Sequence, residues 1–525
     1  MSEPYYAPRF DIRISGVFLA ADVTSQVVRV KYDSDLDVAS MFSIVLRNPD
    51  NKLLDSALFD LGKTVEIHMG YGNDLQPMML GEVTSIEPSF PESGAPTLAV
   101  TGYDKSYRMR HNVPEAKQHR YVNDSLIAAQ IAAENLLVPI VDPSPIGHLQ
   151  KPILQTESDM AFLKERAQAN FFEVRVWWDK LYFQFPRPQG SAYVLEWGKN
   201  LSSFSPRISS AGMAGLQVVR SYSEDLAQTI VAFAMAPQLD VESLVEKIGS
   251  AGIELLLSLG RRVSRVHNIE SPFDASVLAK SLLLDILEGL YEGSGSCIGI
   301  PDLQAGKYIQ IRGVGKRFSG TYRLRKATHT IDENGYRTSF EVTQRSGSNI
   351  LGLLRKTIHE LPQPNQQEKF YGVMVAKVTS NVEILDGPPA VPLGRVKVSF
   401  PGISENVESG WARCAMPMAG KNMGVYFLPE VGDEVIVGFE GGNLSKPVVL
   451  GSVWNTEQMP PASNTDTLNS VRMIKSKSGH TITLDDSPVA PKLVIKSNGG
   501  HTITCDDTKI APKVVIQSSG GHTVT

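Results

Sequence analysis

Three histidines recur at a constant spacing near the end of this 525-residue chain, and their type and arrangement could bind an ion. His480, His501 and His522 lie in copies of one segment, which reads IKSKSGHTIT, IKSNGGHTIT and IQSSGGHTVT. Stacked repeats place equivalent residues in columns, so symmetry-related histidines could hold a metal ion or an anion on an axis. A Gly-Gly bulge before the histidine could equally turn it outward. A hydrogen-bonded ladder of side chains is the favoured interpretation.

Other motifs with possible chemistry do not fit their context. The segment GVGKRFSG (313–320) precedes the strand-like TYRLRK rather than a helix, which predicts a hairpin loop and no phosphate site. HELPQ, which begins at His359, lacks the second histidine of a zinc-protease helix. The aspartate pairs 485–486 and 506–507 are typical of solvated turns rather than of calcium ligands. We therefore expect no catalytic residue and no cofactor.

The composition is that of an ordinary globular protein. The chain is 42% hydrophobic and carries a formal net charge of −5, which indicates no general affinity for nucleic acid or membranes. The start, MSEPYYAPRF, lacks the basic and apolar regions of a signal peptide, and the longest apolar run near the middle, IELLLSLG, is too short for a membrane helix. The distant Cys297, Cys414 and Cys505 exclude a disulfide framework and indicate a reduced compartment. We therefore expect a cytoplasmic protein.

The elements that must position these residues are mainly strands. Short β-branched segments separated by turn residues predict a barrel or sandwich in the first hundred residues. Two helical patterns follow, one capped by Asn123 or Asp124 and one by Ser158. A helical pattern returns at 240–291, before further strands and a hairpin at Asn334-Gly335.

These patterns divide the chain into several units, as a length of 525 residues requires. The fold class is mainly β. The predicted units are a first β-barrel (1–115), an α/β insertion (116–205), a second β-barrel with a helical segment (206–358), a linker (359–369), a compact all-β domain (370–456) and the 21-residue repeats (457–525). The role of the helical stretch at 240–262 is not apparent from its sequence.

The terminal repeats have too few large apolar residues to fold alone. The second repeat has only Leu493, Val494, Ile495 and Ile503. Burying each contributes about 1.5–3 kcal/mol, whereas ordering each of 21 residues costs at least about 1 kcal/mol. The missing core must come from other chains, which predicts several copies intertwined around one axis as a β-prism or triple-stranded β-helix. The open last strand predicts either a capping protein or a longer natural chain.

Between residues 394 and 455 the sequence resembles a known family. GRVKVSFPG, WARCAMPMAGKNMGVYFLPEVGDEVIVGFEGG and KPVVLGSVWN are similar to the OB-fold domain of VgrG-type spikes and of phage baseplate spikes. The alternating valines of RVKVSF and DEVIVGF make physical sense as strands of a small barrel. The motif residues are Gly394, Arg395, Trp411, Arg413, Gly420, Gly424, Gly432, Asp433 and Glu434.

The first 360 residues resemble, through TGYDKSYRM, WWDKLYFQFP and neighbouring segments, the phage hub or late-control D protein. This resemblance implies two hub barrels per chain and a homotrimer whose pseudo-sixfold ring matches a hexameric inner-tube protein. It also implies contacts with baseplate components and a PAAR-type tip protein. We expect the tip to dock on Gly520, Gly521, His522, Thr523, Val524 and Thr525. The target membrane would be contacted only on firing.

The family also contains spikes with an enzyme after the OB fold or behind the needle. Here about 18 residues separate Asn455 from Met473 and none follow Thr525, so we expect no enzyme. The preferred function is the spike of an extracellular phage-tail-like particle. The alternatives are a type VI secretion or phage tail spike, a stand-alone trimeric adhesin and a cell-wall hydrolase.

Overall fold

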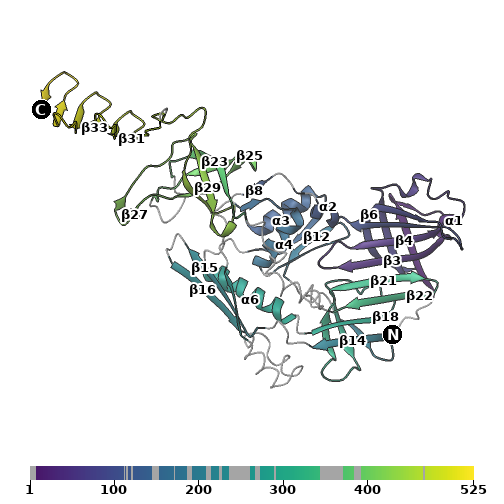
Figure 1. Ribbon diagram of the computed structural model, residues 1–525. Coiled ribbons are helices and arrows are strands. Elements are labelled where there is room, and N and C mark those ends of the chain that lie inside the picture. Colours follow the sequence, from purple (N-terminus) through teal and green to yellow (C-terminus); the bar gives the residue numbers. More distant parts are fainter. Residues whose placement is uncertain are drawn as a thin grey trace.

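The protein is elongated, with its first strands at one end and its last strands at the other (Figure 1). The computed structural model describes residues 7–111, 113, 116–119, 122–144, 153–170, 172–185, 192–208, 214–223, 228–235, 260–265, 272–288, 291–342, 370–383, 392–464 and 467–525. The linker predicted at 359–369 and most of the helical stretch predicted at 240–262 lie outside these residues.

The largest sheet runs through the hub, the part of the chain before residue 343. Within the described residues it has eleven strands, in the order β14-β18-β22-β21-β3-β4-β7-β6-β5-β1-β2. Their bounds are β1 (Pro8–Ile14), β2 (Val17–Phe18), β3 (Val27–Asp35), β4 (Met41–Arg47), β5 (Thr64–Tyr71), β6 (Asp74–Ser89), β7 (Thr97–Asp104), β14 (Leu201–Ile208), β18 (Tyr291–Ile298), β21 (Lys326–Asp332) and β22 (Gly335–Glu341). The short α1 (Ala21–Thr24) and the 3-10 helix η1 (Ala57–Phe59) lie between the early strands.

Two separate apolar cores lie along this sheet. The first is built on β1 and β3–β7 and includes Phe42, Ile44 and Val65. The second includes Leu201 and Phe340 and is shared with the small sheet of β13 (Tyr193–Glu196), β19 (Tyr308–Arg312) and β20 (Gly320–Arg323). The two cores meet where β21 pairs antiparallel with β3, and in this pairing His329 lies opposite Tyr32. The hub thus contains two β modules, each with its own core, on one continuous sheet.

Several strands depart from the sequence prediction. β14 crosses the predicted boundary between residues 205 and 206. β18, with the sequence YEGSGSCI, begins at Tyr291, where a helical pattern was expected to end.

Both predicted hairpins of this region are present. The loop at 313–320 connects β19 and β20 as a hairpin, and β21 and β22 form the hairpin predicted at Asn334-Gly335.

The α/β insertion packs two helices on short strands. Its elements are α2 (Ser106–His111), β8 (Lys117–His119), α3 (Asp124–Glu134), β9 (Val138–Val141), β10 (Ile153–Gln155), α4 (Asp159–Ala169), β11 (Glu173–Trp177) and β12 (Lys180–Gln184). Asn123 caps α3, since its side chain accepts the amide of Leu126. Ser158 occupies the N-cap position of α4 without a side-chain cap hydrogen bond. Both helices bury apolar faces, including Ile127, Ile131 and Phe162, in one core.

A further small sheet follows in the second half of the hub. β16 (Gln228–Met235), β15 (Leu216–Ser223) and β17 (Arg261–Arg265) form it in that order. α6 (Pro272–Glu288) confirms the second half of the predicted helical region and lies next to β15 and β16 in Figure 1. Residues 261–265 form a strand rather than the helix expected there, because they pair in parallel with β15.

The all-β domain has the predicted small-barrel core. Its elements are β23 (Val373–Ser380), β24 (Lys397–Phe400), β25 (Ser404–Glu408), β26 (Arg413–Cys414), β27 (Ala419–Gly420), β28 (Met423–Gly424), β29 (Glu434–Phe439), η3 (Glu440–Gly442) and β30 (Pro447–Ser452). Val396, Val398 and Phe400 are fully buried, as are Val435 and Val437. The alternation in RVKVSF and DEVIVGF therefore places one face of each segment in the core, as predicted.

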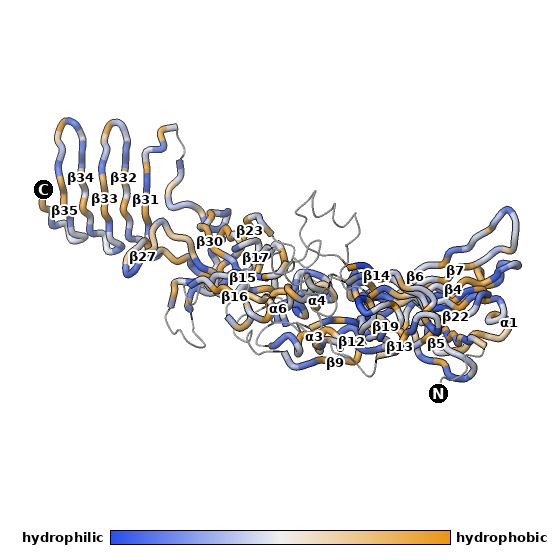
Figure 2. The backbone as a smooth tube through the Cα atoms, turned by 90° about the horizontal axis from the view of Figure 1, so that it is seen from below, coloured by the Kyte–Doolittle hydropathy of each residue, from blue (hydrophilic) through white to orange (hydrophobic). Residues whose placement is uncertain are grey.

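The repeats form a single antiparallel meander, which we call the needle. Its strands are β31 (Val471–Lys475), β32 (Thr481–Asp485), β33 (Lys492–Lys496), β34 (Thr502–Asp506), β35 (Lys513–Gln517) and β36 (Thr523–Val524). Each strand pairs with the next one along the chain, so successive loops stand side by side in Figure 2. Gly479, Gly500 and Gly521 have φ between +88° and +97° in the turns before the histidines. The glycines thus supply the turns, because other residues rarely adopt this backbone conformation.

Candidate assembly surfaces

The needle presents one apolar face. Two side-chain columns cross its strands: Ile474, Ile482, Ile495, Ile503, Ile516 and Val524 in one, and Arg472, Leu484, Leu493, Cys505 and Val514 in the other. The five isoleucines each expose 40–50% of their surface. A contiguous apolar strip of this kind is uncommon on an isolated soluble protein and marks an interaction surface.

The opposite face of the needle is largely polar. Asp485, Lys492, Asp506 and Lys513 alternate in sign along one column, and Lys492 lies 3.8 Å from Asp485. The next column on this face contains Met473, Thr483, Val494, Thr504 and Val515, and the one after it contains lysines, threonines and Gln517. Because charged side chains favour water and the isoleucines do not, the two faces have different preferred environments. The needle is therefore an amphipathic sheet, with one apolar and one largely polar face.

The three histidines lie in turns rather than in strands. His480 and His501 are exposed at the ends of the turns 476–480 and 497–501. The Nδ1 atom of His480 accepts the amide of Asn498 at 3.1 Å, and that of His501 accepts the amide of Ser519 at 3.2 Å. Each ring thus joins its turn to the equivalent turn of the next repeat. The condition for an axial position, an unbroken strand through the histidine, is not met in this structure.

The last residues form an exposed end to the sheet. Gly520, Gly521, His522, Thr523, Val524 and Thr525, where the tip protein is expected to dock, are all exposed. β36 pairs with β35 through Val524 and Thr523. Its other side has no strand partner among the described residues. Such an edge offers unpaired backbone groups to another chain.

The GDE part of the OB motif forms a tight turn that is tied to its surroundings. Gly432 has φ +94°, a conformation that favours glycine. The Asp433 carboxylate accepts the amide of Glu430 at 2.8 Å and the side-chain amide of Gln458 at 3.0 Å. Glu434 accepts the side-chain amide of Asn455 at 2.8 Å. This turn therefore fixes the segment that leads from the OB domain to the needle.

The basic and aromatic motif residues make ion pairs and a cation–π contact within the barrel. Arg395 pairs with Glu383 at 2.6 Å, and only 3% of the Glu383 side chain is exposed. Arg413 pairs with Glu440 across the domain. The ammonium group of Lys397 lies 5.2 Å from the ring centroid of Trp411, within the range of a cation–π contact. These motif residues thus have structural roles on the surface of a small barrel.

The remaining motif glycines shape a protruding hairpin, which we call the arm (417–427). Gly420 pairs with Met423 and Gly424 with Ala419, so that Lys421 and Asn422 form its tip. A Cβ atom on Gly424 would lie 2.5 Å from the Met418 carbonyl oxygen, so no other residue fits there without a shift.

At the base of the arm, Tyr426 lies over Gly394, which has φ +69°; an added Cβ atom there would lie 3.5 Å from the tyrosine ring. All residues from 417 to 427 are exposed, including Met418, Met423 and Phe427. The sequence reasoning assigned the glycines to this loop but missed the exposed apolar side chains beside them. The run MGVYF could have indicated them, because it lacks charge.

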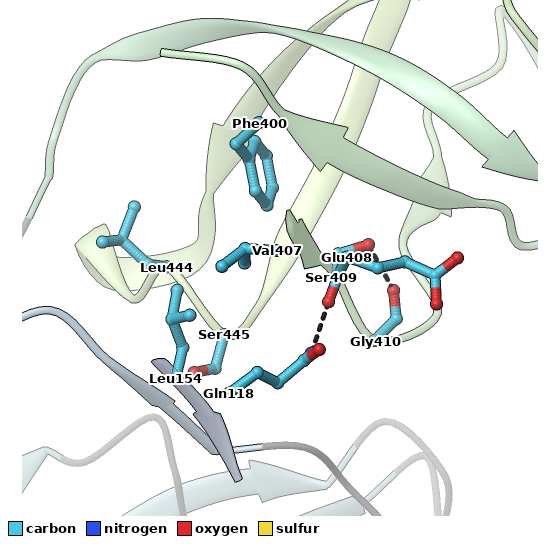
Figure 3. Close-up of a pocket in the computed structure, with 9 residues that line it drawn as sticks. All are labelled: Gln118, Leu154, Phe400, Val407, Glu408, Ser409, Gly410, Leu444 and Ser445. Carbon is cyan, nitrogen blue, oxygen red and sulfur yellow. Dashed lines mark hydrogen bonds between the residues drawn. The ribbon is translucent and has the colours of Figure 1, made fainter. Parts of the chain in front are cut away.

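The OB domain meets the α/β insertion through a small contact (Figure 3). There Gln118 and Leu154 face Phe400, Val407 and Leu444 across a pocket, with room for about one water molecule. The Gln118 side chain donates a hydrogen bond to the Glu408 carbonyl. The contact joins two parts of the chain 290 residues apart in sequence, and its size does not suit a ligand.

The insertion itself contains a buried ionic network. Arg166 contacts Asp124 at 2.6 Å, and the Asp124 side chain is fully buried. Burial raises the pKa of the neighbouring Glu165 to about 7, Arg166 opposes this shift, and Glu157 adds to it. Arg166 thus compensates the buried charge of Asp124, whereas burial disfavours the charged form of Glu165.

Neither a metal site nor a membrane helix is found in the part of the chain that the structure describes. Within it, no group of three or more His, Cys, Asp and Glu side chains is arranged to bind a metal ion. No helix there is both long and apolar enough to cross a membrane.

Comparison with protein families gives two matches. Residues 381–454 match the type VI secretion system/phage-baseplate injector OB domain. The spike protein VgrG1a of Pseudomonas aeruginosa is 42% identical over 72 residues, 13% of this chain and 11% of that protein. VgrG3 of Vibrio cholerae is 32% identical over 123 residues, 22% of this chain and 11% of that protein. The chain thus spans about a tenth of the length of these curated relatives.

Solved structures share the fold over more of the chain. A chain of the Francisella PdpA–VgrG complex matches with a TM-score of 0.55 and 8% identity, over 98% of this chain and 88% of that one. The Escherichia coli c3393 protein, a type VI secretion component similar to the T4 tail proteins gp27 and gp5, matches with a TM-score of 0.50 and 13% identity, over 84% of this chain and 99% of that one.

The OB match and the shared fold define the class, a VgrG-type baseplate hub and spike protein. A second family model, the Alg8 N-terminal domain, matches residues 8–333, more than half of the chain. The chain therefore belongs to the Alg8 N-terminal domain family.

Proposed function

We propose that this chain is the trimeric central spike of a contractile injection system, in an extracellular phage-tail-like particle. Three copies adapt a hexameric inner tube to a three-fold needle, carry a tip protein and pierce the target envelope mechanically. The protein is not an enzyme in this proposal. It is assembled in the bacterial cytoplasm and leaves the cell as part of the particle, where its hub also contacts baseplate components.

The observation that carries the proposal is the apolar face of the needle. Full burial of one isoleucine contributes about 1.5–3 kcal/mol, so covering the 40–50% that each of five isoleucines still exposes would contribute roughly 3–7 kcal/mol per chain. Three needles with these faces turned toward a common axis bury the isoleucines and leave the charged column in water. Closed rotational symmetry makes the same strip serve all three copies.

The two cores of the hub support the tube-adapter role. Each chain has one β module around Phe42 and Val65 and a second around Leu201 and Phe340. Three chains would place six modules in a ring, which is the number needed to face a hexamer. The continuous sheet through β21 and β3 would fix the two modules of one chain relative to each other.

The free side of β36 supports the placement of the tip protein. A separate chain that adds to Thr523 and Val524 would cover the exposed end of each needle. Deleting residues 516–525 is expected to abolish copurification of a PAAR-type tip protein while the hub stays assembled. Stoichiometric copurification of the tip after this deletion would contradict the placement.

The mass of the purified protein in solution tests the central claim. One chain has a mass of 57.4 kDa, and light scattering coupled to gel filtration is expected to give three times this value. A well-folded monomer at micromolar concentration would refute the proposal. Genes for sheath, tube and baseplate beside this gene, without genes for a membrane complex, would favour a free particle over a type VI secretion spike.

A further inference from the structure

We propose that the arm (417–427) is a trimerisation clasp, which packs its apolar side chains against the base of the needle of a neighbouring copy. This inference rests on the trimer proposed above and assigns a function to a segment that the OB core does not need. The partner surface would be β31 and β32, at the base of the needle of the next copy.

The first step is that the arm contributes no side chain to the core of its own domain. The OB core is formed by Val396, Val398, Val435, Val437 and their neighbours. No residue between 417 and 427 belongs to that core, whereas the next residue, Leu428, packs against it. The arm is therefore anchored at Leu428 and is otherwise free of its own domain's core.

The second step is the character of the exposed side chains. Tyr426 exposes 75% of its surface, Met423 62%, Phe427 61% and Met418 50%. Large aromatic and methionine side chains are enriched in the cores of protein interfaces and rarely stand together in solvent. Lys421 and Asn422 keep the tip of the hairpin polar, as at the rim of an interface.

The third step is rigidity. The two strands of the arm are closed by the pairs Ala419–Gly424 and Gly420–Met423, and the Val425 amide donates to the Met418 carbonyl at 3.0 Å. The arm therefore has a defined shape before it binds. A preformed hairpin loses less conformational entropy on docking than a disordered segment would.

The fourth step is position, which identifies a second copy as the partner. In Figures 1 and 2, β27 extends away from the strands of the OB domain and along the molecule toward the level of the first needle strand. The segment that follows the arm is tied to the needle, because Glu430 pairs with Lys477 at 2.7 Å. The end of the arm and the base of the needle of one chain thus lie at the same level along the molecule. A neighbour related by three-fold rotation would bring its own needle base to this level.

Site-specific photocrosslinking of the full chain tests the clasp. A benzoylphenylalanine at Phe427 is expected to give bands at two and three times 57.4 kDa, with crosslinked peptides that contain residues from 471 to 485 of another copy. The mass of the uncrosslinked protein is measured first. A trimer whose Phe427 crosslinks stay within one chain, or which gives none, would overturn the clasp and leave the proposed function standing. A monomer would refute both.

A matched pair of tyrosine variants gives an independent readout. Tyr426 in the arm and Tyr371 near the start of β23 each expose 75% of their surface. Tyr426→Ser is expected to raise the concentration at which half of the trimer dissociates by about tenfold or more, because a buried aromatic contact is lost at three symmetric positions. Tyr371→Ser is the control with the same loss of exposed area. The clasp would be excluded if the two substitutions had equal effects and Phe427 gave no crosslinks between copies.

Discussion

The sharpest prediction concerns the isoleucine column of the needle. Ile495 and Ile503 are directly opposite each other on β33 and β34, and they expose 42% and 40% of their surface in one chain. Covering these fractions in a trimer contributes roughly 1.2–2.5 kcal/mol per chain, or about 4–7 kcal/mol for three chains. The double substitution Ile495→Ala, Ile503→Ala should remove most of this contribution.

This magnitude converts into a measurable shift. A loss of about 4–7 kcal/mol lowers the trimer association constant by roughly three to five orders of magnitude. Since that constant scales with the square of concentration, the concentration for half-dissociation should rise about 30- to 300-fold. Analytical ultracentrifugation over a protein dilution series, in a fixed urea concentration that brings the wild-type chain into range, measures this value.

The control lies on the opposite face of the same strand. Val494 is adjacent to Ile495 but belongs to the column that contains Thr483 and Thr504. Val494→Ala also removes β-branched volume from β33, so it accounts for any weakening of the single-chain sheet. We expect its shift in half-dissociation to be less than about threefold. This face would not be the interface if the isoleucine variant left the half-dissociation concentration unchanged, or if the valine variant raised that concentration more than the isoleucine variant did.

Four further outcomes are expected. Burial raises the pKa of Glu165 from 4.5 to about 7, so the folded state binds the proton more tightly and hub stability should fall as pH rises through this window. At pH 8 the free energy of unfolding of Glu165→Gln, measured by urea titration, should exceed that of the wild type by about 2–3 kcal/mol. At pH 4 the two should differ little. Arg166→Met should destabilise the hub by about 3–5 kcal/mol in urea titrations, because it leaves the buried Asp124 carboxylate without its cation. Gly299→Ala should lower the melting temperature strongly, because its Cβ atom would lie 2.0 Å from the Tyr336 ring. Elemental analysis of the purified protein should find no stoichiometric metal ion at the histidine column, since two of its rings already accept backbone amides.

The sequence predicted best those elements whose pattern is local. The needle strands follow from alternation within a repeat, and the turns from glycines that adopt positive φ. The OB strands follow from alternating valines such as Val396 and Val398, which the structure buries completely. In the needle, neighbours along the chain are also neighbours in the sheet, and in the OB domain this holds for β23, β24 and β25 and for β29 and β30.

Elements that depend on distant partners were not predictable in the same way. β18 is rich in glycine and serine, residues that are poor strand formers. It is a strand because it pairs with β14 on one side and β22 on the other. Glycine is required at 295, since a Cβ atom there would lie 2.5 Å from the Phe340 ring and 2.7 Å from the Ser203 carbonyl. The pairing of β21 with β3, some 300 residues apart, likewise has no signal in either segment alone.

The candidate surfaces show the same division. The motif glycines and the residues proposed to bind a tip protein could be named from their sequence, but the neighbours of the motif glycines could not. That Tyr426 lies over Gly394, and that Phe427 points into solvent while Leu428 joins the core, depends on how the arm leaves the barrel. Hydrophobic residues in a loop are compatible with either location until the core is known.

The length of the needle depends on the number of complete repeats. Each 21-residue unit adds two paired strands, or about 10 Å of length at the usual strand spacing. Duplication of one unit would keep both apolar columns in line and every histidine over the next turn, whereas an insertion of any other size would shift the columns out of alignment. Duplication of a repeat in the gene would therefore lengthen the needle without any change in the hub.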